Sequence, residues 1–141
     1  MESGGIRRRF EAYAEFAWEI KSQIDRIERL EADALAPSAP SLDGMPRGQG
    51  GPGDRVGRAV VLLDQLRETV RGMVQEEKAE RAALEAIMVP LTAREKSILR
   101  LHYIDGLGWR EMEDIVCLTA RGCQGTAERA FEKLEKLERN G

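Results

Sequence analysis

The sequence has few of the residues that build catalytic, redox or metal sites. Its 141 residues include two cysteines and one histidine. Cys117, Cys123 and His102 lack the four-ligand spacing of structural zinc, so we expect both cysteines to be small, reduced core residues. No nucleophile is arranged with a histidine, no carboxylate pair stands out, and no glycine-rich phosphate loop is present. We therefore expect no enzymatic activity, no catalytic residue, no metal site and no cofactor.

Aromatic residues and long apolar runs are also scarce. Aromatic side chains make up 5% of the chain, although 42% of it is hydrophobic. This composition favours a mostly helical protein of one or two small domains. No apolar run reaches the length of about 18 residues that suggests a membrane span, and MESGGIRRRF is followed by charged residues rather than a secretory apolar core. We expect an all-α, cytoplasmic protein with no membrane partner.

An excess of positive charge, the usual footprint of phosphate binding, is missing as well. The formal net charge is -3, and residues 90–141 hold nine basic and nine acidic side chains. The distribution of charge is more informative than its sum. In the last predicted helix, Arg121 and Gln124 lie near the N-terminal end, whereas four acidic residues gather farther along: Glu128, Glu132, Glu135 and Glu138.

Two long segments carry apolar residues at alternating spacings of three and four, the pattern of a coiled-coil seam. The first seam is Phe10, Tyr13, Ala17, Ile20, Ile24 and Ile27; the second is Ala59, Leu63, Leu66, Val70, Met73, Leu84 and Ile87. They predict helices over about 6–35 and 56–88, in a long N-terminal helical hairpin or coiled coil. Val60 and Val74 widen the second stripe beyond what one partner covers, which favours a homodimer in a four-helix arrangement.

Residues 36–55, between the two helices, hold four of the five prolines and five of the fourteen glycines. This composition predicts a Pro/Gly-rich loop. Twenty residues exceed what a helical hairpin needs, so a swapped dimer is an alternative to antiparallel pairing within one chain. We assign residues 1–89 to a helical dimerisation region and residues 90–141 to a second domain.

The second domain carries clear helix boundaries. Pro90 disfavours helical geometry before it, and Thr92 with Glu95 forms a capping box, so a helix should begin at about Ala93. Asp105 and Gly106 suit a left-handed stop.

Two further helices follow in helix-turn-helix spacing. The first should last two turns, to about Cys117 and Leu118, with Trp109, Met112, Ile115 and Val116 on one side. Thr119 can cap the longer second helix, whose inward residues would be Cys123, Ala127, Ala130, Phe131 and Leu134. A short helix, a three-residue turn and a capped second helix have the geometry that places the second helix in a major groove.

The segment from Leu91 to Leu134 resembles sigma-70 region 4. The resemblance rests on Gly106, Glu111, Met112, Leu118, Thr119, Arg129 and Ala130. With Trp109 and the helical N-terminal half, the chain looks like the small sigma-like regulators of Gram-positive phages and prophages, and residues 45–48 (MPRG) are similar to a loop of that group. The sequence departs from the family pattern at Glu113, where alanine is usual, at Cys117, where glycine is usual, and at Gly122 and Gly125 in the recognition helix.

The resemblance implies a sequence-specific DNA-binding transcription regulator, an activator of late phage genes that also contacts RNA polymerase. Thr119 would cap the recognition helix, and Arg121 and Gln124 would read base edges of double-stranded DNA. Gly122 and Gly125 would let the DNA backbone approach closely. Phosphates would be held by Arg110 and by Arg94 or Lys96, with Arg100 as a further candidate.

Plainer interpretations stand beside these. Trp109 can fill the junction between helical layers, His102 can pack or lie at the surface, and the arginines at positions 7–9 can form a solvated helix start. The alternative function is a helical oligomerisation or interaction protein that does not bind DNA, acting in phage assembly or polymerase binding.

Overall fold

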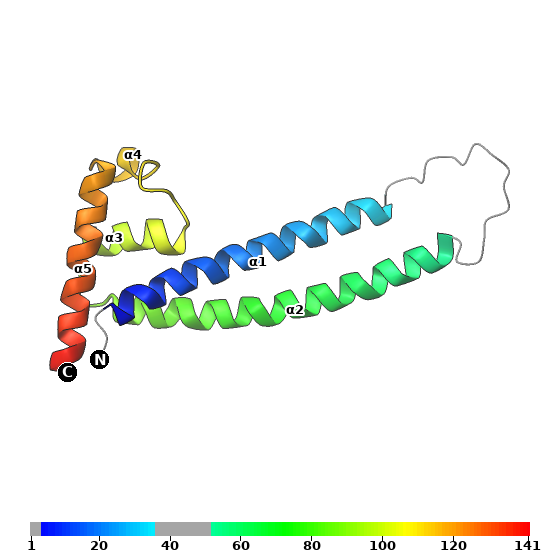
Figure 1. Cartoon of the computed structure of the whole chain (residues 1–141), viewed down its shortest axis with the longest axis horizontal. Helices are drawn as coiled ribbons and strands as arrows, with labels where there is room; N and C mark the ends of the chain where they lie inside the picture. Colours follow the sequence, from blue (N-terminus) through cyan, green and yellow to red (C-terminus); the bar gives the residue numbers. More distant parts are fainter. Residues whose placement is uncertain (1–3, 36–51) are drawn as a thin grey trace. The chain divides into compact units, whose positions relative to one another are not determined.

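A computed structural model describes residues 4–35 and 52–141 of the chain, and these residues form helices and connecting turns without a strand. The elements are α1 (Gly5–Leu35), α2 (Pro52–Ile87), α3 (Ala93–Leu99), the π-helix η1 (Arg100–Ile104), α4 (Glu113–Val116) and α5 (Ala120–Asn140) (Figure 1). The all-α prediction is confirmed for this part of the chain. None of its helices combines the length and the apolar character needed to cross a membrane.

The boundaries of the two long helices differ slightly from the predicted ones. α1 begins one residue earlier than expected, whereas α2 begins at Pro52 instead of at residue 56. Proline suits the first position of a helix because its φ is preset and its missing N–H would have no intrahelical acceptor there. Residues 52–55 of the predicted loop are therefore helical. The rest of that loop, including the MPRG sequence at 45–48, lies outside the described residues.

The chain divides into two compact units, one formed by residues 1–18 with 76–141 and the other by residues 19–75. Helices α1 and α2 each contribute one part to each unit. This division by packing differs from the predicted boundary at residue 89, because the start of α1 and the end of α2 pack with the C-terminal helices. The functional division at residue 89 stays a prediction.

The core of the first unit is built around Phe10, which is fully buried. Its ring meets those of Tyr103 and Phe131 edge-on, with centroids 5.8 and 5.3 Å away. Aromatic pairs prefer this arrangement because the positive edge of one ring faces the negative face of the other. The predicted inward residues of α5 are all buried in the same core: Cys123, Ala127, Ala130, Phe131 and Leu134. Residues from α1, α2, α3, η1 and α5 thus share one apolar cluster.

A carboxylate of α5 caps the N-terminus of α1. Glu135 accepts hydrogen bonds from the backbone N–H groups of Gly4 (2.6 Å) and Ile6 (2.9 Å), and α1 has no acidic residue in its own first turn. The bond from Gly4 holds the pKa of Glu135 below its ordinary value, aided by Ile6 and Arg7 and opposed by burial. The orphan donors at the start of α1 are therefore satisfied by a residue about 130 positions away in the sequence.

An ion pair helps to align α1 with α2 in the first unit. Arg9 of α1 donates two 2.8 Å hydrogen bonds to Glu80 of α2, which lies between Met73 and Leu84, where the predicted second seam has no apolar residue. The guanidinium of Arg9 lowers the pKa of the Glu80 carboxyl, although burial acts in the opposite direction. Because both side chains are partly exposed, the pair contributes modestly to stability and chiefly fixes which faces meet.

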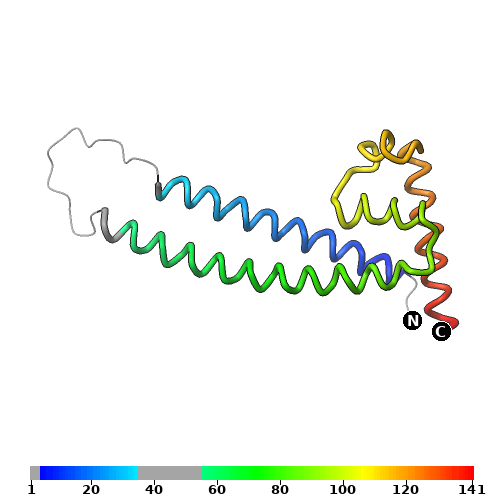
Figure 2. The backbone as a smooth tube through the Cα atoms, turned by 180° about the vertical axis from the view of Figure 1, so that it is seen from behind, coloured from blue at the N-terminus to red at the C-terminus, as the bar shows by residue number. Residues whose placement is uncertain are grey.

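In the second unit, residues 19–35 of α1 and 52–75 of α2 lie side by side (Figures 1 and 2). Its buried side chains among those described are Ile20, Ile27 and Leu63. Arg67 reaches Glu31 across the pair at 2.7 Å. Ile24, which we predict in the first seam, is 38% exposed. Within one chain, α2 therefore covers only part of the predicted seam of α1, and the seam stays a prediction at Ile24.

The structure predicts that Phe10→Ala destabilises the protein by about 3–5 kcal/mol, the usual loss for a large buried aromatic side chain. Urea unfolding followed by circular dichroism measures this loss. Trp18→Ala is the matched control, since Trp18 lies on the same helix and is 71% exposed. We expect the control to change stability by less than about 0.5 kcal/mol. Equal losses for the two variants would contradict the position of Phe10 in the core.

Glu135→Gln should lower the free energy of unfolding by about 0.5–2 kcal/mol at neutral pH, because the amide loses the charge that favours a helix N-terminus. Since the pKa of Glu135 is lower in the folded state, its carboxylate stabilises the fold at neutral pH, and this stabilisation disappears as the pH falls through the lowered value. Unfolding curves over an acidic pH series should therefore converge for the two proteins. Glu132→Gln, one turn earlier at an exposed position, should show no such convergence.

Candidate nucleic-acid interface

The predicted first helix of the second domain begins at Ala93, as the capping box requires. The Glu95 N–H donates to Thr92 Oγ1 at 3.2 Å, and the Thr92 N–H donates to Glu95 Oε1 at 2.9 Å. Lys133 of α5 also reaches Glu95, at 2.8 Å. Burial works against the charged form of Glu95, but Lys133 and the Thr92 bonds outweigh it and lower its pKa. The start of α3 is thereby tied to α5.

The predicted stop at Gly106 is confirmed, but it is reached through a π-helix. Asp105 donates its N–H to the carbonyl of Arg100 at 2.8 Å, a bond that spans five residues. Gly106 then adopts φ +79°, a left-handed conformation that glycine enters without steric cost. The π-helix was not predicted, because its wider turn differs from an α-helix by a single residue and leaves the apolar spacing almost unchanged.

His102 and Trp109 stack on each other at the turn that follows η1. Their ring centroids are 3.7 Å apart with an interplanar angle of 17°, and His102 Nδ1 lies 2.8 Å from the carbonyl oxygen of Leu107. Gly108 donates its N–H to Glu111 Oε1 at 2.9 Å. These contacts fit the packing interpretation of both aromatic residues. They also hold the segment that leads to α4.

Helix α4 is shorter than predicted. It lasts one turn, Glu113–Val116, and is ended by Cys117, which adopts φ +58°. The left-handed region costs a residue with a Cβ roughly 1–2 kcal/mol, which explains why glycine suits this position better. Cys117 is exposed, so its assignment to the core is wrong, whereas Cys123 is buried as predicted. Ile115, predicted on the same side as Met112, is 58% exposed, whereas Met112 is fully buried.

Thr119 caps α5 as predicted. Its Oγ1 accepts the N–H of Gly122 at 3.0 Å. A Cβ at position 122 would lie 3.3 Å from that oxygen, so glycine at this position leaves room for the cap. At Gly125 a Cβ would make an ordinary contact with the Arg129 guanidinium, and no described contact requires glycine there.

The first turns of α5 present Arg121 and Gln124 to the surface. Both side chains are exposed, whereas Cys123 of the same helix is fully buried, so they lie away from the side of α5 that packs in the core. Glu128 continues this exposed stripe one turn later. The recognition surface that we predict on α5 is thus accessible, with a cation at its start and an anion at its end.

The residues predicted to contact phosphates differ in their exposure and in whether they already form an ion pair. Arg94 on α3 and Arg110 before α4 are exposed, and neither they nor Arg121 make an ion pair with a described residue. Arg100 is held by Glu85 of α2, through bonds of 2.7 and 2.8 Å. Arg100 is the main reason why the pKa of the Glu85 carboxyl is lowered, and half-buried Lys96 adds to this effect. Arg94 and Arg110 are consequently better placed than Lys96 or Arg100 to bind an external anion.

The arginines at positions 7–9 have intramolecular contacts rather than forming a free basic run. Arg7 lies over the ring of Phe131 at 5.3 Å from its centroid, and Arg9 pairs with Glu80. Neither contact could be inferred from sequence spacing, because each joins positions far apart in the chain. The prediction of a merely solvated helix start therefore needs correction for Arg7 and Arg9.

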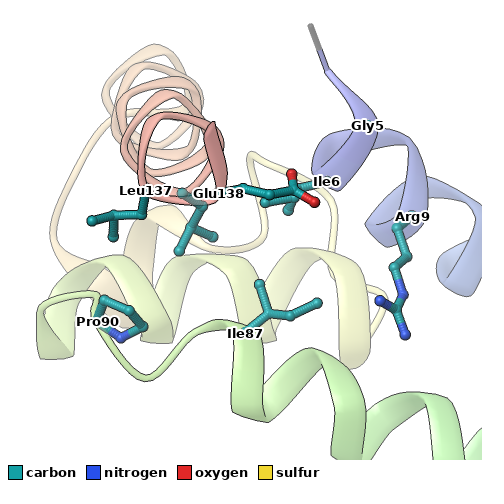
Figure 3. A pocket seen from close by; sticks show the side chains of 8 residues that line it. Gly5, Ile6, Arg9, Ile87, Pro90, Leu137 and Glu138 are labelled. Carbon is teal, nitrogen blue, oxygen red and sulfur yellow. The ribbon is translucent and has the colours of Figure 1, made fainter. Parts of the chain in front are cut away.

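An open pocket of about 520 Å³ lies among the start of α1, the end of α2 and the second half of α5 (Figure 3). It is lined by Gly5, Ile6, Arg9, Ile87, Pro90, Leu134, Leu137 and Glu138. Arg9 is already paired with Glu80, and the floor is largely apolar. In the described part of the chain, no three His, Cys, Asp or Glu residues gather as metal ligands would.

No known family, curated protein or solved structure matches this chain.

Cys117→Gly should raise the stability of the protein by up to about 1 kcal/mol, because relief of the left-handed conformation exceeds the extra entropy of glycine in the unfolded chain. Cys117→Val should lower stability, since a β-branched residue tolerates positive φ poorly. Thermal unfolding of the three proteins checks this order. A wild type more stable than Cys117→Gly would contradict the left-handed turn.

Proposed function

We propose that the chain is a sequence-specific DNA-binding regulator of transcription, of the phage or prophage type, with α4 and α5 as a helix-turn-helix. The observation that carries this proposal is the exposed start of α5, where Arg121 makes no ion pair with a described residue. Arg121 and Gln124 project from a helix whose other side is anchored in the core through Cys123, Ala127 and Phe131. A helix fixed in this way can present its first turns to a major groove without losing its packing.

The side chains present have the chemistry that base reading needs. An arginine donates two parallel hydrogen bonds to O6 and N7 of guanine, and a glutamine can pair with adenine through N6 and N7. Arg121 and Gln124 are three residues apart and thus address neighbouring positions on one face of α5. Arg94 and Arg110 are exposed cations that can bind phosphates, and such contacts would set the register of the helix on the duplex.

The acidic half of α5 is less adverse to DNA than its composition suggests. Glu135 is engaged by backbone N–H groups at the start of α1, whose positive helix end compensates its charge. Glu128 is the first acidic residue of the exposed stripe, and it follows Arg121 by seven residues, about 10 Å along the helix. This separation leaves the first two turns of α5 free of a competing carboxylate.

The helical N-terminal half fits a dimerisation role in the same proposal. A single C-terminal domain, residues 90–141, has no net charge and would bind DNA weakly. A homodimer would raise the effective affinity by linking two half-sites. Because the C-terminal domain resembles sigma-70 region 4, we further propose that it contacts RNA polymerase. Recruitment of polymerase would activate late genes rather than repress them.

The second candidate function is an interaction protein that has lost DNA binding. It is favoured by the net charge of -3 and by Gly125, which weakens the recognition helix by about 1 kcal/mol without a packing reason. Titration with random duplexes at low and physiological salt separates the two. Steep weakening with salt, together with a preferred sequence from selection, supports the regulator. Absence of binding at low salt supports the interaction protein.

Arg121→Ala should weaken binding to the selected sequence by about 5- to 150-fold, equivalent to 1–3 kcal/mol, and leave binding to random duplex nearly unchanged. Fluorescence anisotropy with both duplexes measures the two affinities. Lys136→Ala is the matched control, because it removes one exposed cation from the far end of the same helix. An equal loss on both duplexes would refute base reading by Arg121.

A further inference from the structure

The second compact unit has too small a core to be stable as two helices. Of its described side chains, Ile20, Ile27 and Leu63 are buried, whereas others that could extend this core, such as Leu66, Val70 and Met73, are only half-buried. A helical pair gains its stability from apolar packing rather than from intrinsic propensity, and three buried side chains offset little of the conformational entropy of some 40 ordered residues. The unit therefore needs additional apolar cover.

Some of the apolar side chains of the second unit that remain exposed lie along one stripe on each helix. On α1, Ile20, Ile24, Ile27 and Glu31 follow one another at spacings of four and three; on α2, Val56, Val60, Leu63 and Arg67 do the same. The Arg67–Glu31 pair joins the two stripes, which places them on the same side of the unit. Within these stripes Ile24, Val56 and Val60 remain 38%, 50% and 49% exposed. We call these three residues the lateral face.

The charges around the lateral face suit a second copy of the same unit. Residues 19–35 carry five acidic and three basic side chains, whereas residues 55–75 carry four basic and two acidic ones. Arg55 and Arg58, beside Val56 and Val60, make no ion pair with a described residue, and the same holds for Glu28 on α1. In a two-fold pair, α1 of one copy can meet α2 of the other, so opposite charges flank a shared apolar strip.

We propose that two copies of the chain associate through the lateral face formed by Ile24, Val56 and Val60, giving a four-helix core. This inference deepens the proposed dimeric regulator, but it rests on packing in the second unit and not on DNA binding. The stripes of both copies would then be covered on two sides, as a wide apolar stripe requires.

Two adjacent valines of α2 provide a sharp test. Val60 has Val56 and Leu63 as its helical neighbours and belongs to the lateral face. Val61 is 57% exposed, but its neighbours at spacings of three and four are Gly57, Arg58, Asp64 and Gln65, so it faces away from the apolar stripe. Val60→Glu and Val61→Glu therefore introduce the same charge at nearly the same exposure, one inside the proposed interface and one outside it.

Sedimentation equilibrium of the full chain, without DNA, measures the dissociation constant of the dimer. We expect a dimeric wild type, at least a tenfold higher dissociation constant for Val60→Glu, and an unchanged one for Val61→Glu. Ile24→Glu, on the other helix, should weaken the dimer in the same way. Circular dichroism of each variant at a concentration where the wild type is dimeric reports whether its helices are retained.

The proposal is overturned by a wild type that stays monomeric over the accessible concentration range, or by Val60→Glu and Ile24→Glu both remaining as dimeric as the wild type. Equal weakening by Val60→Glu and Val61→Glu would overturn it as well. DNA titration gives an independent result. A dimer without DNA binding refutes the regulator and keeps the interface, whereas a monomer that binds a preferred sequence refutes the interface and keeps the regulator.

Discussion

Phe10 is the residue on which the first compact unit depends. Its ring contacts Tyr103 of η1 and Phe131 of α5, so three segments separated by about 90 and 30 residues meet around one side chain. In a chain with 5% aromatic residues, this cluster concentrates much of the large apolar surface available for burial. The orientation of α5, and with it the exposure of Arg121 and Gln124, follows from the burial of its opposite side against these rings.

Features decided by neighbouring residues could be predicted from the sequence. The capping box of Thr92 and Glu95, the left-handed stop at Gly106 and the cap at Thr119 each depend on backbone groups within a few residues. The buried side of α5 could also be predicted, because its apolar residues keep helical spacing over about three turns. In these cases the local chemistry and the tertiary structure favour the same result.

Features that depend on distant residues could not be predicted in this way. The use of Glu135 as the cap of α1, the pairing of Arg100 with Glu85 and the exposure of Ile24 all require knowledge of which helices meet. Cys117 illustrates a different limit, since a left-handed residue other than glycine is uncommon and its side chain gives little sign of it. For the candidate site, the residue types could be predicted, but which of the four candidate cations are free of internal partners could not.

The contact between Phe10 and Phe131 joins residues that are synthesised at very different times. During synthesis, the ring of Phe10 emerges from the ribosome long before that of Phe131, and it stays without its native neighbours until α5 has been translated. Helices α1 and α2 can form early from local contacts, but the unit that carries α5 must close late. The surface of α5 that carries Arg121 and Gln124 is thus presented abruptly, once α5 has been translated, rather than gradually as the chain grows.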